Sequence, residues 1–366
     1  MKKKIQIVVG IIIGVGLLGF LFRQSDWRAV LAALRTVSPA WVVLSILVVS
    51  PVAYTRTMRW AYIIRSSQWV PLRPIFSASQ IGFLAIMVFP ARLGEIARVL
   101  VLGRLAKIPF SKCVAASALD RVSDFVSLLV VIVVTLLAYK PTTDVRLPAH
   151  LLHLNNDIIV SVNAIRYSEF TIAATVLGMG AVLVGVFLRP KLVLRMSDLC
   201  VGIVSTRLAK SVHTFIQHFV DGLSILKSPV DMAKALFFSL ATWGCYLLGI
   251  TVVMVAFGVD FPWYTPFFVE VCVAAMISMP LAPGAVGQFH VGVVGALKIV
   301  MPEMDIAVTL AISLVVHAIN LIPVVGFGLF CLFWEQFGLI ELSRESEKSK
   351  AILATPQAPE ESSGRL

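Results

Sequence analysis

FPARLGEIAR, residues 89–98, places two arginines and a glutamate directly after a proline, between the apolar runs IGFLAIMV and VLVLG. In a membrane protein, ionisable side chains at bilayer depth are costly and usually functional. Irregular backbone is tolerated there only inside protein or beside a water-filled cavity. We therefore interpret the broken apolar region Ile75–Lys107 as a hairpin whose turn and return arm carry these charges.

The composition of the whole chain is that of a membrane protein. Of its 366 residues, 58% are hydrophobic and only 14% are charged, and the mean hydropathy is +0.92. This balance excludes a soluble globular domain. The net charge of +11 comes from basic residues scattered between apolar runs. It indicates membrane orientation and attraction to anionic lipid heads, and it argues against a nucleic-acid partner.

Apolar runs long enough to span a bilayer predict six full transmembrane helices. They are Ile5–Phe22, Ala40–Met58, Cys113–Tyr139, Phe170–Leu188, Ala235–Gly258 and Ile306–Phe333. Two further regions, Ile75–Lys107 and Pro266–Val300, are each broken near the middle by proline and glycine. The prediction is an all-α, polytopic helical membrane protein with six full spans and two re-entrant helical hairpins.

The distribution of basic residues orients this arrangement. With the N-terminus in the cytoplasm and both broken regions re-entrant, 23 Lys and Arg residues lie on the cytoplasmic side and 7 outside. This asymmetry agrees with the positive-inside rule, and it would shrink if residues 75–90 simply crossed the bilayer. The first hairpin is therefore expected to enter from the cytoplasm and the second from outside.

The flanking spans correspond at an offset of about 190–195 residues, as an inverted-topology repeat with a substrate site near the midplane would require. Two unrelated broken helices are the alternative.

The predicted regions are 1–39 (first span and interfacial helix), 40–139 (repeat A with the cytoplasmic hairpin), 140–233 (connecting loop, span and amphipathic helices), 234–334 (repeat B with the outer hairpin) and 335–366 (disordered cytoplasmic tail).

The first candidate cluster is the polar turn itself, with Pro90, Arg92, Gly94, Glu95 and Arg98. On a helix Glu95 lies three residues from each arginine, so it can neutralise one and leave one positive charge. A guanidinium suits phosphate through its bidentate fork, and a glycine permits close backbone approach. The alternative is an ion-pair network that only holds the hairpin together.

The second cluster is LDRVSD, residues 119–124. Asp120 and Asp124 share a helix face at a spacing of four residues, which costs free energy unless a cation lies between them. Arg92 or Arg98 of the hairpin is the expected cation. A buried lock between helices is the alternative to a binding role for this cluster, which also contains Arg121.

The third cluster is TRTMRW, residues 55–60, in which Arg56 lies deep enough to face a cavity. The alternative is a snorkelling end of a span, with Arg59 reaching the interface and Trp60 as an aromatic anchor.

The fourth cluster is PLAPGAVGQFH, residues 280–290, at the second break. Its helix-breaking positions are Pro283, Gly284 and Gly287. Gln288 and His290 are its strongly polar side chains, and His317 of the last span is placed to face them. A satisfied packing role is the alternative for the histidines.

Together these motifs resemble the lysylphosphatidylglycerol synthase transmembrane-region family, also called flippase-like membrane proteins, over roughly Trp27–Phe333. FPARLGEIAR is similar to the family's P-x-R-x-G-E-x-x-R element, LDRVSD to its E-R-x-x-D element and PGAVGQFH to its P-G-G-x-G-x-x-E hairpin. Asp120 and His290 stand where the family usually has Glu, and Ala285 replaces the second Gly. Larger family members carry a soluble aminoacyl-transferase domain, and we expect none in this chain.

The resemblance implies lipid translocation, with an aminoacylated phospholipid, a hopanoid or a polyprenyl-linked lipid as cargo. We expect a lipid flippase or lipid transporter for an anionic or phosphate-bearing lipid, in the inner (cytoplasmic) membrane with both termini cytoplasmic. Arg92, Arg98 and Arg121 would bind phosphate, oriented by Glu95, Asp120 and Asp124. We expect no catalysis, cofactor or metal. The alternatives are a membrane-embedded enzyme that modifies a lipid head group, and a non-catalytic partner of a lipid synthase or glycosyltransferase.

Overall fold

The computed structural model describes residues 26–89, 93–140, 145–147, 158–163, 228–278 and 282–336, together with the single positions 19, 167 and 178. The predicted spans Ile5–Phe22 and Phe170–Leu188 lie outside these ranges apart from one residue each. Most of the stretch 189–233 and the tail after residue 336 also lie outside them.

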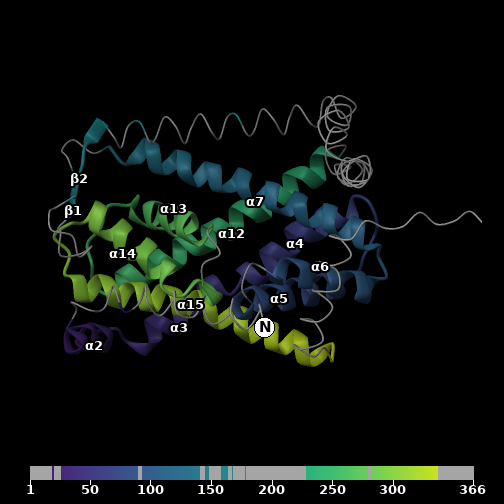
Figure 1. Cartoon of the computed structure of the whole chain (residues 1–366), viewed down its shortest axis with the longest axis horizontal. Helices are drawn as coiled ribbons and strands as arrows, with labels where there is room; N and C mark the ends of the chain where they lie inside the picture. The colour runs from purple at the N-terminus through teal and green to yellow at the C-terminus, as the bar shows by residue number, and fades with distance from the viewer. Residues whose placement is uncertain are drawn as a thin grey trace, which may run out of the picture.

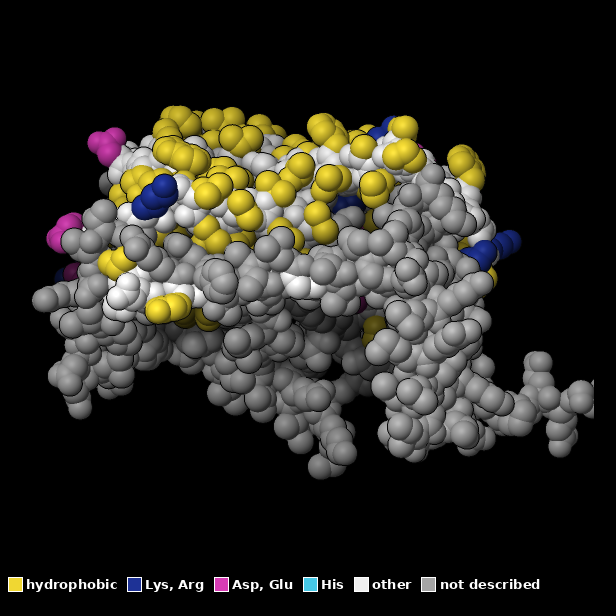
Figure 2. Space-filling view, turned by 90° about the horizontal axis from the view of Figure 1, so that it is seen from above, with side chains coloured by type: hydrophobic (Ala, Val, Ile, Leu, Met, Phe, Trp, Pro, Cys, Tyr) yellow, Lys and Arg dark blue, Asp and Glu magenta, His cyan; other side chains and the backbone are white. Residues whose placement is uncertain are grey.

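Five helical stretches among the described residues are long and apolar enough to cross a membrane. They are Pro39–Arg65, Lys112–Ala138, Pro229–Ala256, Pro283–Val300 and Ile306–Trp334. On the face in Figure 2 hydrophobic side chains form a broad band, and the charged side chains lie mainly toward its ends. A multi-pass helical membrane protein is thereby confirmed, whereas the count of six spans stays a prediction. The 18-residue stretch Pro283–Val300, predicted as part of a hairpin, itself meets the length of a span.

The first described helices follow local sequence signals. Helix α2 (Trp27–Thr36) begins where the Asp26 carboxylate accepts a hydrogen bond from the Arg28 backbone amide at 2.8 Å. Trp27 is exposed while Val30 is buried, so a helix with an exposed and a buried side lies within the predicted region 1–39, whereas its position at the membrane interface stays a prediction. Helices α3 (Pro39–Val49) and α4 (Val52–Arg65) form one apolar stretch that is interrupted at Pro51, which lacks the amide hydrogen that a continuous helix needs.

The first broken region forms two helices, α5 (Leu72–Val88) and α6 (Leu93–Ala106), that pack against each other. Glycine permits this approach. A Cβ at Gly94 would collide with the Ile86 backbone nitrogen and the Gly82 carbonyl oxygen, and a Cβ at Gly82 would lie 2.5 Å from the Arg98 Cβ. The two arms of the predicted hairpin are therefore present and in contact at the level of the backbone.

Helix α7 (Phe110–Ala138) matches the predicted third span. Beyond it, strands β1 (Val145–Leu147) and β2 (Ile158–Val160) pair antiparallel, with Val145 opposite Val160. The prediction of an all-α chain did not include this short pair. Helix α12 (Pro229–Ala256) then begins with Ser228 as its cap and proline at its first position.

The second broken region contains α13 (Thr265–Ser278), the single 3₁₀ turn η2 (Pro283–Ala285) and α14 (Gln288–Val300), followed by α15 (Ile306–Trp334). The turn between the arms uses left-handed backbone, with φ of 63° at Gly284 and 83° at Gly287, which glycine adopts without strain. A Cβ on Gly284 would lie 3.7 Å from the Met87 carbonyl oxygen. The ends of the two hairpins therefore meet.

Contacts between the halves follow a reciprocal pattern. Helix α5 of the first hairpin packs on α15, α13 of the second hairpin packs on α7, and α4 packs on α12. In Figure 1 the α5–α6 hairpin lies toward the right of the long axis and the α13–α14 hairpin toward the left. The three pairings are reciprocal, while the inverted repeat and the membrane sidedness of each hairpin stay predictions.

Substitution of Gly94 by alanine should destabilise the hairpin, because its new methyl group must displace backbone of α5. Overpacking of this kind typically costs about 1–3 kcal/mol. The free energy of unfolding in detergent should fall by that amount. Gly244→Ala in α12 is the matched control, because a Cβ there meets no atom within 4 Å, and it should cause no loss. Equal stability of the two variants would contradict the close approach of α5 and α6.

Candidate functional site

The centre of the candidate site is the carboxylate of Asp120, which is fully buried on α7. Arg59 of α4 donates a hydrogen bond from Nε to one carboxylate oxygen at 2.6 Å, and Arg98 of α6 donates from Nη1 to the other at 2.6 Å. Both arginines are at most 1% exposed. The consecutive helices α6 and α7 are thus joined to the more distant α4 by one anion.

Asp124, one helical turn further along α7, shares the Arg59 guanidinium. Arg59 Nη1 donates to its carboxylate at 2.7 Å and also to the Ser239 hydroxyl of α12 at 3.0 Å. The predicted cation between Asp120 and Asp124 is therefore confirmed, but the cation is Arg59. Arg98, one of the two arginines expected there, reaches Asp120 alone, and Arg92 lies outside the described residues.

Arg98 also lies over an aromatic ring. Its guanidinium carbon is 3.6 Å from the Trp60 ring centroid, and its Nη2 donates to the Ser79 hydroxyl at 3.3 Å. Trp60 and Arg59 are both 0% exposed. The interpretation of residues 55–60 as a snorkelling interfacial end is therefore wrong for these two side chains, because α4 continues into the protein interior.

Arg121 forms the outer edge of the network. Its Nη2 lies 3.4 Å from Glu95 and 3.5 Å from Asp120, its Nη1 lies 3.5 Å from Asp124, and its side chain is 37% exposed. Among the described residues Glu95 pairs with Arg121 of α7, and its predicted pairing with Arg92 falls outside them. Pro90, at the turn before α6, lies outside the described residues.

Among the described residues, the charges of this network balance. Arg59, Arg98 and Arg121 face the three carboxylates of Glu95, Asp120 and Asp124. Isolated buried charges are costly, whereas mutual hydrogen bonding compensates them. The geometry of Arg59 and Arg98 therefore agrees with the structural alternative for this cluster, a lock between α4, α6, α7 and α12.

Arg56, one turn before Arg59 on α4, is placed differently. Its guanidinium carbon lies 4.6 Å from the Phe83 ring centroid and 5.4 Å from that of Tyr246. Its Nε is buried and has no hydrogen-bond partner in the part of the chain that the structure describes. The ion pairs found between described residues do not include Arg56. It is a partly buried cation held by aromatic rings.

Arg56 lines a narrow cavity between both halves of the molecule. Gln80 of α5, Tyr246 of α12 and Asn320 of α15 supply its other polar side chains. Glu270 of α13 lies near enough to interact electrostatically with both Arg56 and Asp124. The cavity thus offers a positive group and hydrogen-bonding groups in an otherwise apolar setting.

The polar residues of the second break form a separate cluster. Gln288 and His290 are buried at the start of α14, and the ring centroids of His290 and His317 are 4.8 Å apart. His317 Nε2 lies 3.0 Å from the Gly284 carbonyl oxygen, and Phe289 stacks on the His317 ring. The predicted approach of His317 is confirmed, and it ties α15 to the turn that meets α5.

The sequence prediction of the site did not include Gln80, Tyr246 and Asn320. Each is a polar side chain within a largely apolar helix, which is a signal that marks functional positions in membrane segments. Ser239, which completes the Arg59 contacts, gave no such signal because serine is common in apolar helices.

Comparison with known proteins adds a family and one curated relative. The family model described as the lysylphosphatidylglycerol synthase TM region matches residues 7–328. A protein named glycosyltransferase AglD from Haloferax volcanii is 26% identical over 341 residues, which cover 88% of this chain and 54% of the relative. The chain thus spans about half the length of that relative. No solved structure matches the chain.

Asp120→Asn should destabilise the protein strongly, because it leaves Arg59 and Arg98 buried without their shared anion. Removing one partner of a buried ion pair costs about 3–5 kcal/mol, measurable as a loss of unfolding free energy in detergent. Asp231→Asn is the control: its pair with Lys234 at 3.8 Å is partly exposed, and such pairs contribute about 0–1 kcal/mol. Similar costs for both variants would exclude Asp120 as the centre of a lock.

Proposed function

The chain belongs to the lysylphosphatidylglycerol synthase transmembrane-region family, and from this premise we propose that it is a lipid flippase or lipid transporter. Its cargo is an anionic or phosphate-bearing lipid, which it moves across the cytoplasmic membrane. The head group passes through the polar space where the hairpins meet, while the acyl chains stay in the bilayer.

The observation that carries this proposal is the position of Arg56. Arg56 is partly buried, its Nε is shielded from water, and it has no carboxylate at ion-pair distance among the described residues. A ligand anion would complete such a guanidinium favourably. Phe83 and Tyr246 partly compensate by cation–π contact, which a phosphate oxygen can supplement. Arg56 is therefore the first head-group contact in this proposal, with Gln80 and Asn320 of the same cavity as hydrogen-bonding neighbours.

The arginines of the Asp120 network take a different role. Arg59 and Arg98 are engaged by carboxylates, so they hold the helices that place Arg56. Arg121, which is 37% exposed at the edge of the network, is the second candidate for phosphate contact, beside Arg92. Pairing with Glu95 keeps Arg121 oriented toward α6.

The architecture supports transport across the bilayer. Two broken regions with tips in contact, and reciprocal packing of each hairpin on the other half, are features that an inverted repeat of two re-entrant hairpins would have. Transporters with inverted repeats place the substrate site where the repeats meet. We propose the orientation that the basic residues favour, with both termini in the cytoplasm.

Enzymatic modification of a lipid is the second candidate, because the curated relative is named a glycosyltransferase. In that case the membrane part would bind a lipid for a reaction, alone or with a partner enzyme. Loss of the protein would then change the chemical structure of a membrane lipid, and its distribution between leaflets would change only as a consequence.

Reconstitution into proteoliposomes with a fluorescent anionic phospholipid tests the proposal. Arg56→Gln should slow crossing of the head group by about tenfold or more, because hydrogen bonds to charged groups contribute about 1.5–3 kcal/mol. Arg56→Lys should retain part of the rate, because it keeps the charge without the planar fork. Arg104→Gln, which changes an exposed arginine of α6, is the control and should leave the rate unchanged.

Thermal unfolding of each variant separates transport from folding. Arg56→Gln should stay folded with only a small fall in unfolding temperature, because it loses the cation–π contacts but no ion pair between described residues. Crossing at the wild-type rate in a folded Arg56→Gln variant would reject Arg56 as the head-group contact. Absence of any crossing by the wild type, together with a chemically altered lipid in extracts of cells that lack the protein, would favour the enzymatic alternative.

A further inference from the structure

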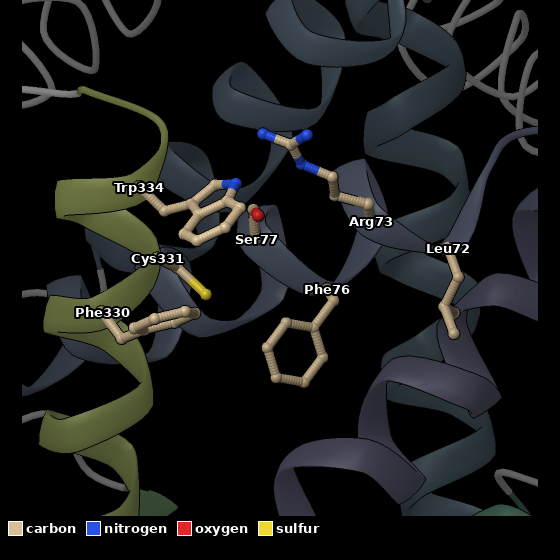
Figure 3. A pocket seen from close by; sticks show the side chains of 7 residues that line it. All are labelled: Leu72, Arg73, Phe76, Ser77, Phe330, Cys331 and Trp334. Atoms are coloured by element: carbon tan, nitrogen blue, oxygen red, sulfur yellow. The ribbon is translucent and has the colours of Figure 1, made fainter.

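A second cavity opens between the start of α5 and the end of α15, with a volume of about 380 Å³. Its walls are Leu72 and Phe76 on one side and Phe330 and Trp334 on the other, as Figure 3 shows, with Ser77 and Cys331 between them. None of the Asp120 network or the Arg56 cavity contributes to it. We call this cavity the α5–α15 groove.

The walls of the groove are apolar and open to the surroundings. Phe330 and Trp334 are each 56% exposed. Phe76 is backed by Phe327 in an edge-to-face contact with ring centroids 6.1 Å apart, so that wall is supported from behind. In a multi-pass membrane protein, such a surface faces hydrocarbon chains.

The mouth of the groove carries one cation. The Arg73 side chain is 65% exposed, and its guanidinium carbon lies 5.4 Å from the Trp334 ring centroid. Its Nε lies 3.3 Å from the Glu335 carboxylate, which also accepts a hydrogen bond from the Ser77 hydroxyl at 2.9 Å. Glu335 thus engages only the Nε edge, and in Figure 3 the two terminal nitrogens point away from the apolar walls.

The groove lies where a membrane span ends. Trp334 is the last residue of the candidate span Ile306–Trp334, and Arg73 is the second residue of α5. Tryptophan is enriched at the head-group level of a bilayer, and basic residues there attract anionic lipids. An apolar slot below a cation at this level matches an amphiphile with a long chain and an anionic head.

We propose that the α5–α15 groove binds an anionic phospholipid of the adjacent leaflet. One acyl chain lies between Phe76 and Phe330, and the phosphate accepts hydrogen bonds from the terminal nitrogens of Arg73. This lipid is bound, not transported, so the inference goes beyond the proposed function and does not depend on it. The occupant that competes with it is the chain's own segment 337–366, which follows directly after the groove.

Trp334 provides the reporter for a test in bilayer nanodiscs. Brominated lipids quench tryptophan at contact, and the difference in fluorescence between the wild type and Trp334→Phe isolates this residue among the 7 tryptophans. Brominated phosphatidylglycerol should quench the Trp334 signal at about fivefold lower mole fraction than brominated phosphatidylcholine. A basic residue near the membrane surface contributes about 1 kcal/mol toward anionic lipid, which is that factor.

Variants at the mouth distinguish recognition from packing. Arg73→Gln should make the two brominated lipids equally effective, and Arg73→Lys should keep the preference. Glu335→Gln should strengthen the preference for phosphatidylglycerol, because it removes the competing carboxylate, whereas a purely structural Arg73–Glu335 pair would give no such gain. Lys112→Gln, an exposed cation of α7 outside the groove, should change nothing.

Three results would overturn the inference. The first is equal quenching by both lipids in the wild type, which would show a groove that takes any acyl chain. The second is a preference that survives Arg73→Gln. The third is a Trp334 signal that neither lipid quenches until residues 337–366 are deleted, which would assign the groove to the chain's own segment.

Discussion

The burial of the Asp120 carboxylate is the constraint around which the described helices are arranged. An ion shielded from water costs several kcal/mol unless opposite charges surround it, and here the charges come from Arg59 on α4 and Arg98 on α6. Arg98 runs against α5 at a position where Gly82 leaves room for it. Arg59 continues to Ser239 of α12. The α5–α6 hairpin, α4 of the first half and α12 of the second half are thus linked through the Asp120 carboxylate and its arginines.

Two arginines of α4, Arg56 and Arg59, have different kinds of partner. Arg59 has two carboxylate partners, whereas Arg56, one turn away on the same helix, rests on aromatic rings with its Nε unsatisfied. A guanidinium held by salt bridges contributes rigidity and exchanges partners slowly. One held by ring faces keeps its hydrogen-bond donors for a ligand. The same residue type therefore serves structure at one position and is suited to binding at the other.

The sequence predicted the elements better than their partners. Hydropathy and the breaks at proline and glycine predicted four described spans and the division of both broken regions into two helices, because these signals are local. The spacing of Asp120 and Asp124 also required a cation between them. Which residue supplies this cation depends on the packing of α4 against α7. Arg59 and Asp120 are 61 residues apart in the sequence, and no local sequence pattern specifies their contact. Arg59 lies at the polar end of an apolar run, where snorkelling is the ordinary outcome. Strands β1 and β2, of three residues each, are too short to leave a periodic signal.

The strength of the ion pair that an arginine forms depends on how far its side chain is shielded from water. The two lipid sites that we propose differ in this respect. At the span end the Arg73 side chain is 65% exposed, so its contact with Glu335 is weak and a lipid phosphate can share the guanidinium without breaking the fold. At the level of Arg56 a permanent carboxylate at ion-pair distance would compete fully with any head group, because charges shielded from water interact strongly. Glu270 lies close enough to Arg56 for an electrostatic interaction, but the ion pairs between described residues do not include one between them. An anionic cargo can then bind at Arg56 at a modest cost in free energy, and it can also leave. A transporter requires both steps, and a permanent ion pair would prevent them.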